Sequence, residues 1–176
     1  MVSPWFFWLL MVVISLGIVG VYLSHMAGRL DRLHLKIQNN RTSLQKSLLT
    51  RANRAQAVAR DYPPDCEAAE QVTQIATECL QPDDQSRESW FVESRLTAAL
   101  LKLSAQPAAN SSLLDWERLI TSARKVALAR TFYNDTTRMC QNLRKRRIVR
   151  WFRLAGYAAY PQPINFDDRV PHSPAP

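Results

Sequence analysis

The sequence has few glycines and lacks the short motifs that mark common enzymes. Only 4 of its 176 residues are Gly, and it contains no Gly-rich phosphate loop, no HExxH and no GxSxG. The alternation of apolar and polar residues that is typical of half-buried strands is also missing. These absences predict an all-α protein that is not an enzyme, and we expect no cofactor, no metal and no small-molecule substrate.

The cysteines and histidines also show no pattern that is typical of a disulfide framework or a metal site. The three cysteines, Cys66, Cys79 and Cys140, are odd in number and have no CxxC spacing, which indicates neither a disulfide framework nor a zinc site. We expect three free thiols. His25 and His34 lie nine residues apart and would point in different directions on a helix, which does not favour a metal site.

Charge is absent from Trp5–Leu23, WFFWLLMVVISLGIVGVYL. As a helix this segment would be about 28 Å long, close to the ~30 Å hydrocarbon core of a bilayer. Aromatic residues gather at its first end and Tyr22 stands near the other, as in interfacial belts. No Lys or Arg precedes the segment and no small-residue cleavage site follows it, so a retained anchor over residues 1–23 is predicted, not a cleaved signal peptide.

Basic residues follow the apolar segment closely. Arg29, Arg32, Lys36 and Arg41 all lie within eighteen residues of its end, whereas none precedes it. The positive-inside rule therefore predicts a single-pass protein of the cell membrane, with a short N-terminus outside and residues 24–176 in the cytoplasm.

The charges after the anchor alternate in sign along the chain. Residues 24–60 hold eight basic and one acidic residue, residues 61–100 two and nine, and residues 101–176 thirteen and five. A uniformly basic chain would indicate nucleic acid. The basic–acidic–basic order instead predicts segments that neutralise one another in a helical bundle and leave one basic surplus.

Apolar periodicity predicts four helices over residues 24–155. A long helix over 24–60 carries a stripe of Leu and Ile, and the prolines after Tyr62 must end it. Asp65 offers an N-cap for a short helix over 66–81, and a second short helix covers 86–105. Ser112 begins another long helix, in which no Pro or Gly appears before Gly156.

These segments predict an antiparallel helical bundle of two long and two short helices. The residues from 156 to 176 form a Pro-rich tail, expected to be extended or disordered. Within the last long helix, Asn134 is unfavourable by propensity. We expect it to make a buried cross-helix hydrogen bond, with Tyr133 packed on the first helix, in preference to forming a ligand site.

The segment Ala123–Asp135, ARKVALARTFYND, resembles the LemA family of small membrane-anchored proteins. The family pattern, close to R-I-A-x-A-R-x-F/Y-Y-N, is matched by Val126, Ala127, Ala129, Arg130, Phe132, Tyr133, Asn134 and Asp135. The end Ile164–Asp168 fits loosely, and an earlier family segment is only partly met, with Arg41 in place of its Trp. The resemblance implies a membrane helix followed by an antiparallel helical bundle, and it brings no catalytic residue.

A basic and aromatic segment, RKRRIVRWFR, follows the LemA-like helix. Nucleic acid is one candidate partner, because arginine and aromatic side chains suit phosphates and bases. In an up-and-down bundle, however, the last helix returns to the membrane, where basic residues bind anionic lipid and aromatic rings enter the headgroup layer. We therefore predict a membrane-surface site formed by Arg144, Lys145, Arg146, Arg147, Arg150, Trp151, Phe152 and Arg153.

The predicted helix lengths also indicate a partner surface. Short helices would cover only the far half of the long pair, and residues 30–40 and 128–143 would form an exposed two-helix stalk beside the membrane. Exposed apolar patches usually mark interaction sites. The predicted partner-binding residues are Leu33, Leu35, Ile37, Phe132, Tyr133 and Met139.

Together these patterns predict a non-enzymatic, membrane-anchored scaffold or accessory subunit of a membrane protein complex. Its expected partners are membrane lipid and either a membrane protein complex or a second copy of the chain. Two alternatives stay open: a ligand sensor or enzyme with a site in the bundle, and a membrane-tethered nucleic-acid binder.

Overall fold

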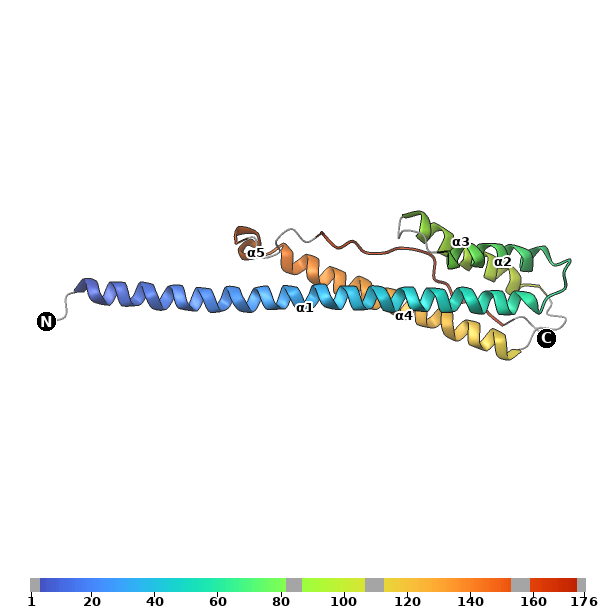
Figure 1. Cartoon of the computed structure of the whole chain (residues 1–176), viewed down its shortest axis with the longest axis horizontal. Coiled ribbons are helices and arrows are strands. Elements are labelled where there is room, and N and C mark those ends of the chain that lie inside the picture. The colour runs from blue at the N-terminus through green and yellow to red at the C-terminus, as the bar shows by residue number, and fades with distance from the viewer. Residues whose placement is uncertain (1–3, 82–86, 107–112, 153–158, 174–176) are drawn as a thin grey trace. The chain divides into compact units, whose positions relative to one another are not determined.

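Helices account for all regular secondary structure in the described part of the chain. The structure is a computed structural model and describes residues 4–81, 87–106, 113–152 and 159–173. Its helices are α1 (Pro4–Arg60), α2 (Glu67–Leu80), α3 (Arg87–Ser104), α4 (Leu113–Arg144) and α5 (Arg147–Trp151) (Figure 1). The all-α prediction is confirmed.

The first helix, α1, continues from the apolar segment to Arg60 without a break. It is the one helix of the described ranges that is long and apolar enough to cross a membrane, and its most apolar window is 0% buried. A helix that is apolar on every face and uncovered by the rest of the chain has the pattern of a membrane span. Its last residue agrees with the end predicted from Pro63 and Pro64.

The two short helices lie close to their predicted bounds, but the expected cap of α2 was wrong. The residue before α2 is Cys66, in extended backbone, and its side chain makes no capping hydrogen bond. Asp65 is therefore not the N-cap. Glu67 and Glu70 in the first turn still favour the start of α2, because negative charge complements the helix dipole there. Ser112, the predicted start of the last long helix, lies outside the described residues.

The last long helix is shorter than predicted. It ends at Arg144, and α5 starts after Arg146, whose ψ of 135° is extended. No Pro or Gly causes this break. Like charges three and four residues apart, such as Arg144 with Arg147 and Arg146 with Arg150, destabilise a continuous helix and give the physical reason.

The chain divides into two compact units. Unit 1 comprises residues 1–38 and 136–162, and unit 2 comprises residues 39–135 and 163–176. Unit 2 contains a core in which side chains from α1, α2, α3 and α4 pack together. Its members include Ala52, Ala55, Val58, Val72, Ala76, Leu96, Leu100, Leu103, Trp116 and Leu119. Trp116, 0% exposed, is the largest of the fully buried side chains.

A buried ion pair crosses the unit 2 core. Arg51 of α1 is 1% exposed and pairs with Glu93 of α3, which is 5% exposed. Arg51 Nη1 also donates to Thr97 Oγ1 at 3.2 Å, and Arg51 Nη2 donates to the Glu93 carbonyl at 3.3 Å. Such a pair needs this hydrogen bonding, because charge removed from water is otherwise costly.

Unit 1 is built mainly from parts of α1, α4 and α5. Met26, Leu30 and Ile37 are buried on α1, and Cys140 and Leu143 are buried on α4. The α1 residues recur at spacings of four and seven, which places them on one helix face. Val149 anchors α5, at 3% exposure.

The described part of the tail, residues 159–173, is extended, which is one of the two states expected for it. It is also packed, because Ile164 and Phe166 are only 7% and 6% exposed. Both belong to unit 2. A Pro-rich segment can still be ordered when a neighbouring surface binds its backbone.

Candidate membrane-surface and docking sites

Aromatic and cationic side chains of α5 face solvent. Trp151 is 83% exposed and Phe152 is 53% exposed. The exposed basic residues of this predicted membrane-surface site are Lys145, Arg146, Arg147 and Arg150. Arg153 lies outside the described residues. The segment therefore offers both the positive charge and the aromatic surface that membrane interfaces bind.

Arg144 differs from its basic neighbours because it binds the tail. Its Nη1 donates to the Ala159 carbonyl at 2.9 Å, and its guanidinium lies 5.3 Å from the centre of the Tyr160 ring. Gln141, one turn earlier, donates to the Pro161 carbonyl at 2.8 Å. Arg144 thus has a structural role within unit 1, besides its predicted place at the membrane surface.

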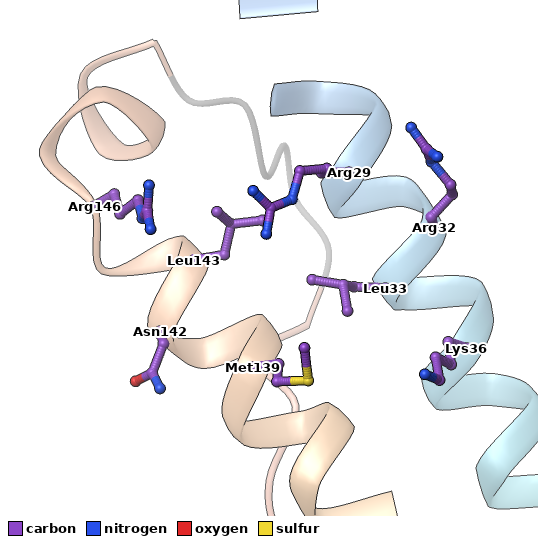
Figure 2. Close-up of a pocket in the computed structure, with 8 residues that line it drawn as sticks. All are labelled: Arg29, Arg32, Leu33, Lys36, Met139, Asn142, Leu143 and Arg146. Atoms are coloured by element: carbon purple, nitrogen blue, oxygen red, sulfur yellow. The ribbon is translucent and has the colours of Figure 1, made fainter. Parts of the chain in front are cut away.

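A groove of about 440 Å³ lies between α1 and α4 in unit 1. Figure 2 shows Leu33 and Met139 extending toward each other across it, with the Arg29 guanidinium reaching toward Leu143. We call it the basic groove. Its lining residues are Arg29, Arg32, Leu33, Lys36, Met139, Asn142, Leu143 and Arg146.

The predicted partner residues of unit 1 divide into exposed and buried side chains. Leu35 is 60% exposed and Met139 is 55% exposed, while Leu33 is half-buried in the basic groove. Ile37 is only 8% exposed. Its assignment to an exposed surface was wrong, because it lies on the α1 face that carries Leu30.

The predicted partner residues of unit 2 divide in the same way. Phe132 is 55% exposed and can meet a partner, whereas Tyr133, its neighbour on α4, is 7% exposed. Adjacent helical residues differ by about 100° in direction, so both cannot share one face. Tyr133 is packed inside the chain, which corrects its assignment to the surface.

Asn134 binds the tail, and no hydrogen bond from its side chain to another helix is found among the described residues. Its Nδ2 donates to the Ile164 carbonyl at 2.9 Å, and the Ile164 amide donates to Asn134 Oδ1 at 2.8 Å. An amide side chain that engages both backbone groups of one residue fixes the register of an extended segment. The cross-helix bond expected for Asn134 is therefore corrected to a tail contact.

Arg130, four residues before Asn134, holds the next part of the tail. It pairs with Asp168 at 2.8 Å, donates to the Phe166 carbonyl at 3.2 Å and lies 5.5 Å from the Phe166 ring centre. The Phe166 ring also stacks on Trp90 of α3 at 5.8 Å. Phe166 is the aromatic anchor of the tail.

Two hydroxyl groups of α3 complete this docking site. Thr97 Oγ1 donates to the Asp167 carbonyl at 2.7 Å, and the Asp167 amide donates to Ser94 Oγ at 3.1 Å. Thr97 also accepts from Arg51. The tail is therefore connected through Thr97 to the buried ion pair. The sequence did not predict this site, although Asn134 in mid-helix and the loose fit of Ile164–Asp168 to the LemA pattern were signals of it.

The three cysteines are free thiols, and Cys79 and Cys140 are poorly suited to nucleophilic chemistry. Burial, together with the nearby Glu93 carboxylate, raises the pKa of Cys79 to about 12. Burial also raises the pKa of Cys140. A thiolate is the reactive form, so both groups are unreactive near neutral pH. Within the described ranges no cluster of His, Cys, Asp and Glu could hold a metal ion.

Comparison with protein-family models, with curated proteins and with solved structures finds no match. The LemA resemblance stays a prediction based on the residues of Ala123–Asp135.

Proposed function

We propose that this protein is a single-pass, membrane-anchored scaffold or accessory subunit of a membrane protein complex, without enzymatic activity. In this proposal α1 to α4 form a LemA-like antiparallel bundle, the N-terminus lies outside the cell membrane and the remainder is cytoplasmic. The support is the exposed apolar start of α1, followed by basic residues from Arg29 onward.

The observation that carries the proposal is the place of α5 in unit 1. Arg146, which precedes α5, lines the basic groove together with Arg29 of α1. Arg29 follows the apolar segment by six residues, a rise of about 9 Å along the helix. The exposed Trp151 and Phe152 therefore belong to the part of the molecule that borders the proposed membrane span. We propose that α5 lies on the anionic leaflet.

A fluorophore on α5 tests this contact in the full chain. After replacement of the native cysteines, Phe152→Cys carries an environment-sensitive label, and the protein is placed in nanodiscs. We expect blue-shifted emission in anionic nanodiscs and a smaller shift in zwitterionic ones, because basic residues near anionic lipid contribute about 1 kcal/mol each. Adding Lys145→Gln, Arg147→Gln and Arg150→Gln should reverse the shift. Equal emission in both lipids would refute leaflet binding through charge.

Partner docking is proposed at exposed apolar residues of both units, Leu35 and Met139 in unit 1 and Phe132 in unit 2. Leu35→Asp and Phe132→Asp should each abolish co-purification of the partner, or self-association, and leave thermal unfolding unchanged. Leu114→Asp is the matched control, because Leu114 is also exposed at 53%. Retention of the partner by both variants would remove these residues from the interface.

A further inference from the structure

The basic groove combines basic side chains, from α1 and from the residue before α5, with an apolar surface. Arg29, Arg32 and Lys36 come from α1 and Arg146 follows α4, and none of the described residues that line the groove is acidic. Figure 2 shows the Arg146 side chain directed toward the α1 side. Leu33, Met139 and Leu143 supply the apolar surface. The groove therefore offers two kinds of contact to one ligand.

The charges in the groove are not neutralised by the described part of the chain. Arg29, Lys36 and Arg146 belong to none of the ion pairs found there. Arg32 Nε donates to the Gly28 carbonyl at 3.2 Å, which uses one of its five N–H groups. Cations that line one groove repel one another, and an anion bound between Arg29 and Arg146 would relieve that repulsion.

The near end of the groove along α1 lies just beyond the headgroup layer of the proposed membrane. Arg29 follows Leu23, the end of the apolar segment, by about 9 Å of helix rise, and Lys36 follows it by about 20 Å. Headgroups extend about 5–8 Å beyond the hydrocarbon core. The Arg29 side chain can reach back into that layer, so the near end of the groove meets lipid phosphates.

We infer that the basic groove is a binding site for the headgroup of an anionic phospholipid, whose acyl chains stay in the bilayer, whose phosphates lie between Arg29 and Arg146 and whose headgroup glycerol covers Leu33 and Met139. A lipid with two phosphates suits four cations better than a lipid with one. Free phosphate would leave the apolar surface of the groove without a contact, and none of the described residues that line the groove carries an aromatic ring on which a nucleic-acid base could stack.

This inference rests on the proposed membrane anchoring, but its test needs neither a bilayer nor α5. The full chain in neutral detergent micelles is titrated with cardiolipin, and lipid adducts are measured by native mass spectrometry. Arg29→Gln with Arg146→Gln should weaken binding about 30-fold, the product of two contributions of the usual size for basic residues at anionic lipid. Neither substitution removes a helix cap, because Arg146 makes no side-chain capping bond.

Arg124→Gln with Lys125→Gln is the matched control, at residues of α4 that lie about 21 Å of helix rise before Met139 and outside the predicted membrane-surface site. It makes the same change in charge at two exposed residues that do not line the groove. We expect it to weaken binding less than about threefold, since distant exposed charges are screened. Equal loss in the two double variants would show diffuse attraction and overturn the site.

Two further arms identify the ligand. Phosphatidylcholine should bind far more weakly than cardiolipin, and excess inorganic phosphate should not displace bound cardiolipin. Equal binding of phosphatidylcholine, or displacement by phosphate alone, would overturn the assignment to an anionic lipid. Loss of the α5 fluorescence shift with intact micellar binding would refute leaflet contact and leave the groove in place.

Discussion

The two units differ in their balance of basic and acidic residues. Unit 2 holds thirteen basic and fourteen acidic residues, and unit 1 holds ten basic residues and a single acidic one, Asp31. Unit 1 therefore carries a net charge of +9 and unit 2 one of −1, which together give the +8 of the chain. The ion pairs of the described chain all lie in unit 2: Arg51–Glu93, Arg95–Glu78, Arg118–Asp115, Arg130–Asp168 and Arg169–Asp167.

This difference separates a unit that pairs its own charges from one whose basic residues belong to no ion pair found among the described residues. In unit 2 arginine side chains make contacts within the protein: Arg51 is buried in the core, and Arg130 binds the tail. In unit 1 Lys145, Arg147 and Arg150 are exposed, with no acidic partner among the described residues. Charge-removing substitutions should therefore affect stability in unit 2 and membrane binding in unit 1.

The largest loss of stability is expected for Arg51→Met. It leaves Glu93 buried without its partner, and breaking a buried ion pair costs about 3–5 kcal/mol. Chemical unfolding followed by circular dichroism measures the change in the free energy of unfolding. Adding Glu93→Leu should recover much of the loss, because the second uncompensated charge is then also removed. No recovery would contradict the view that the unpaired carboxylate causes the loss.

Phe166→Ala should cost about 3 kcal/mol and release the tail, since it removes a buried ring stacked on Trp90. Hydrogen exchange should speed up at Ile164 and Asp167, whose amides donate to α4 and α3 side chains. Phe91→Ala is the control, because that ring is 67% exposed. Unchanged exchange in Phe166→Ala would mean that the backbone bonds hold the tail without its anchor.

Asn134→Ala should cost about 1–3 kcal/mol, because it leaves both backbone groups of Ile164 without their partner. Asn134→Asp is informative, since a carboxylate can still accept from the Ile164 amide but cannot donate to its carbonyl. We expect the free energy of unfolding of Asn134→Asp to be lower than that of the native protein, at or below a value midway to that of Asn134→Ala. Asn142→Ala, at an exposed position of the same helix, should change the free energy of unfolding by less than about 0.5 kcal/mol.

The smallest effect on stability is expected in unit 1. Lys145→Gln, Arg147→Gln and Arg150→Gln together should leave the free energy of unfolding within about 0.5 kcal/mol, because these side chains are exposed and have no described ion pair. Slight stabilisation is possible, since like charges repel. Binding to anionic nanodiscs should nevertheless weaken. A large loss of stability would mean that these residues have internal partners and would remove the contrast between the units.

Patterns among residues close together in the sequence were enough to predict α1, α2 and α3. The apolar segment, the end of α1 before Pro63, and the bounds of α2 and α3 within one or two residues all follow from periodicity and backbone chemistry. These features depend on residues close in sequence. The break after Arg144 was missed, because a run of arginines lacks the proline or glycine that usually marks a helix end.

Only the tertiary structure decided which polar groups meet. Asn134 and Ile164 are thirty residues apart, and Arg51 and Glu93 are separated by forty-two. No local pattern encodes such pairs, because burial makes an arginine or an asparagine favourable only when its partner arrives from elsewhere in the chain. The sequence by itself determined an apolar helix, further helices and a basic surplus. The folded chain determined that unit 2 neutralises its own charge while unit 1 keeps the surplus on its surface.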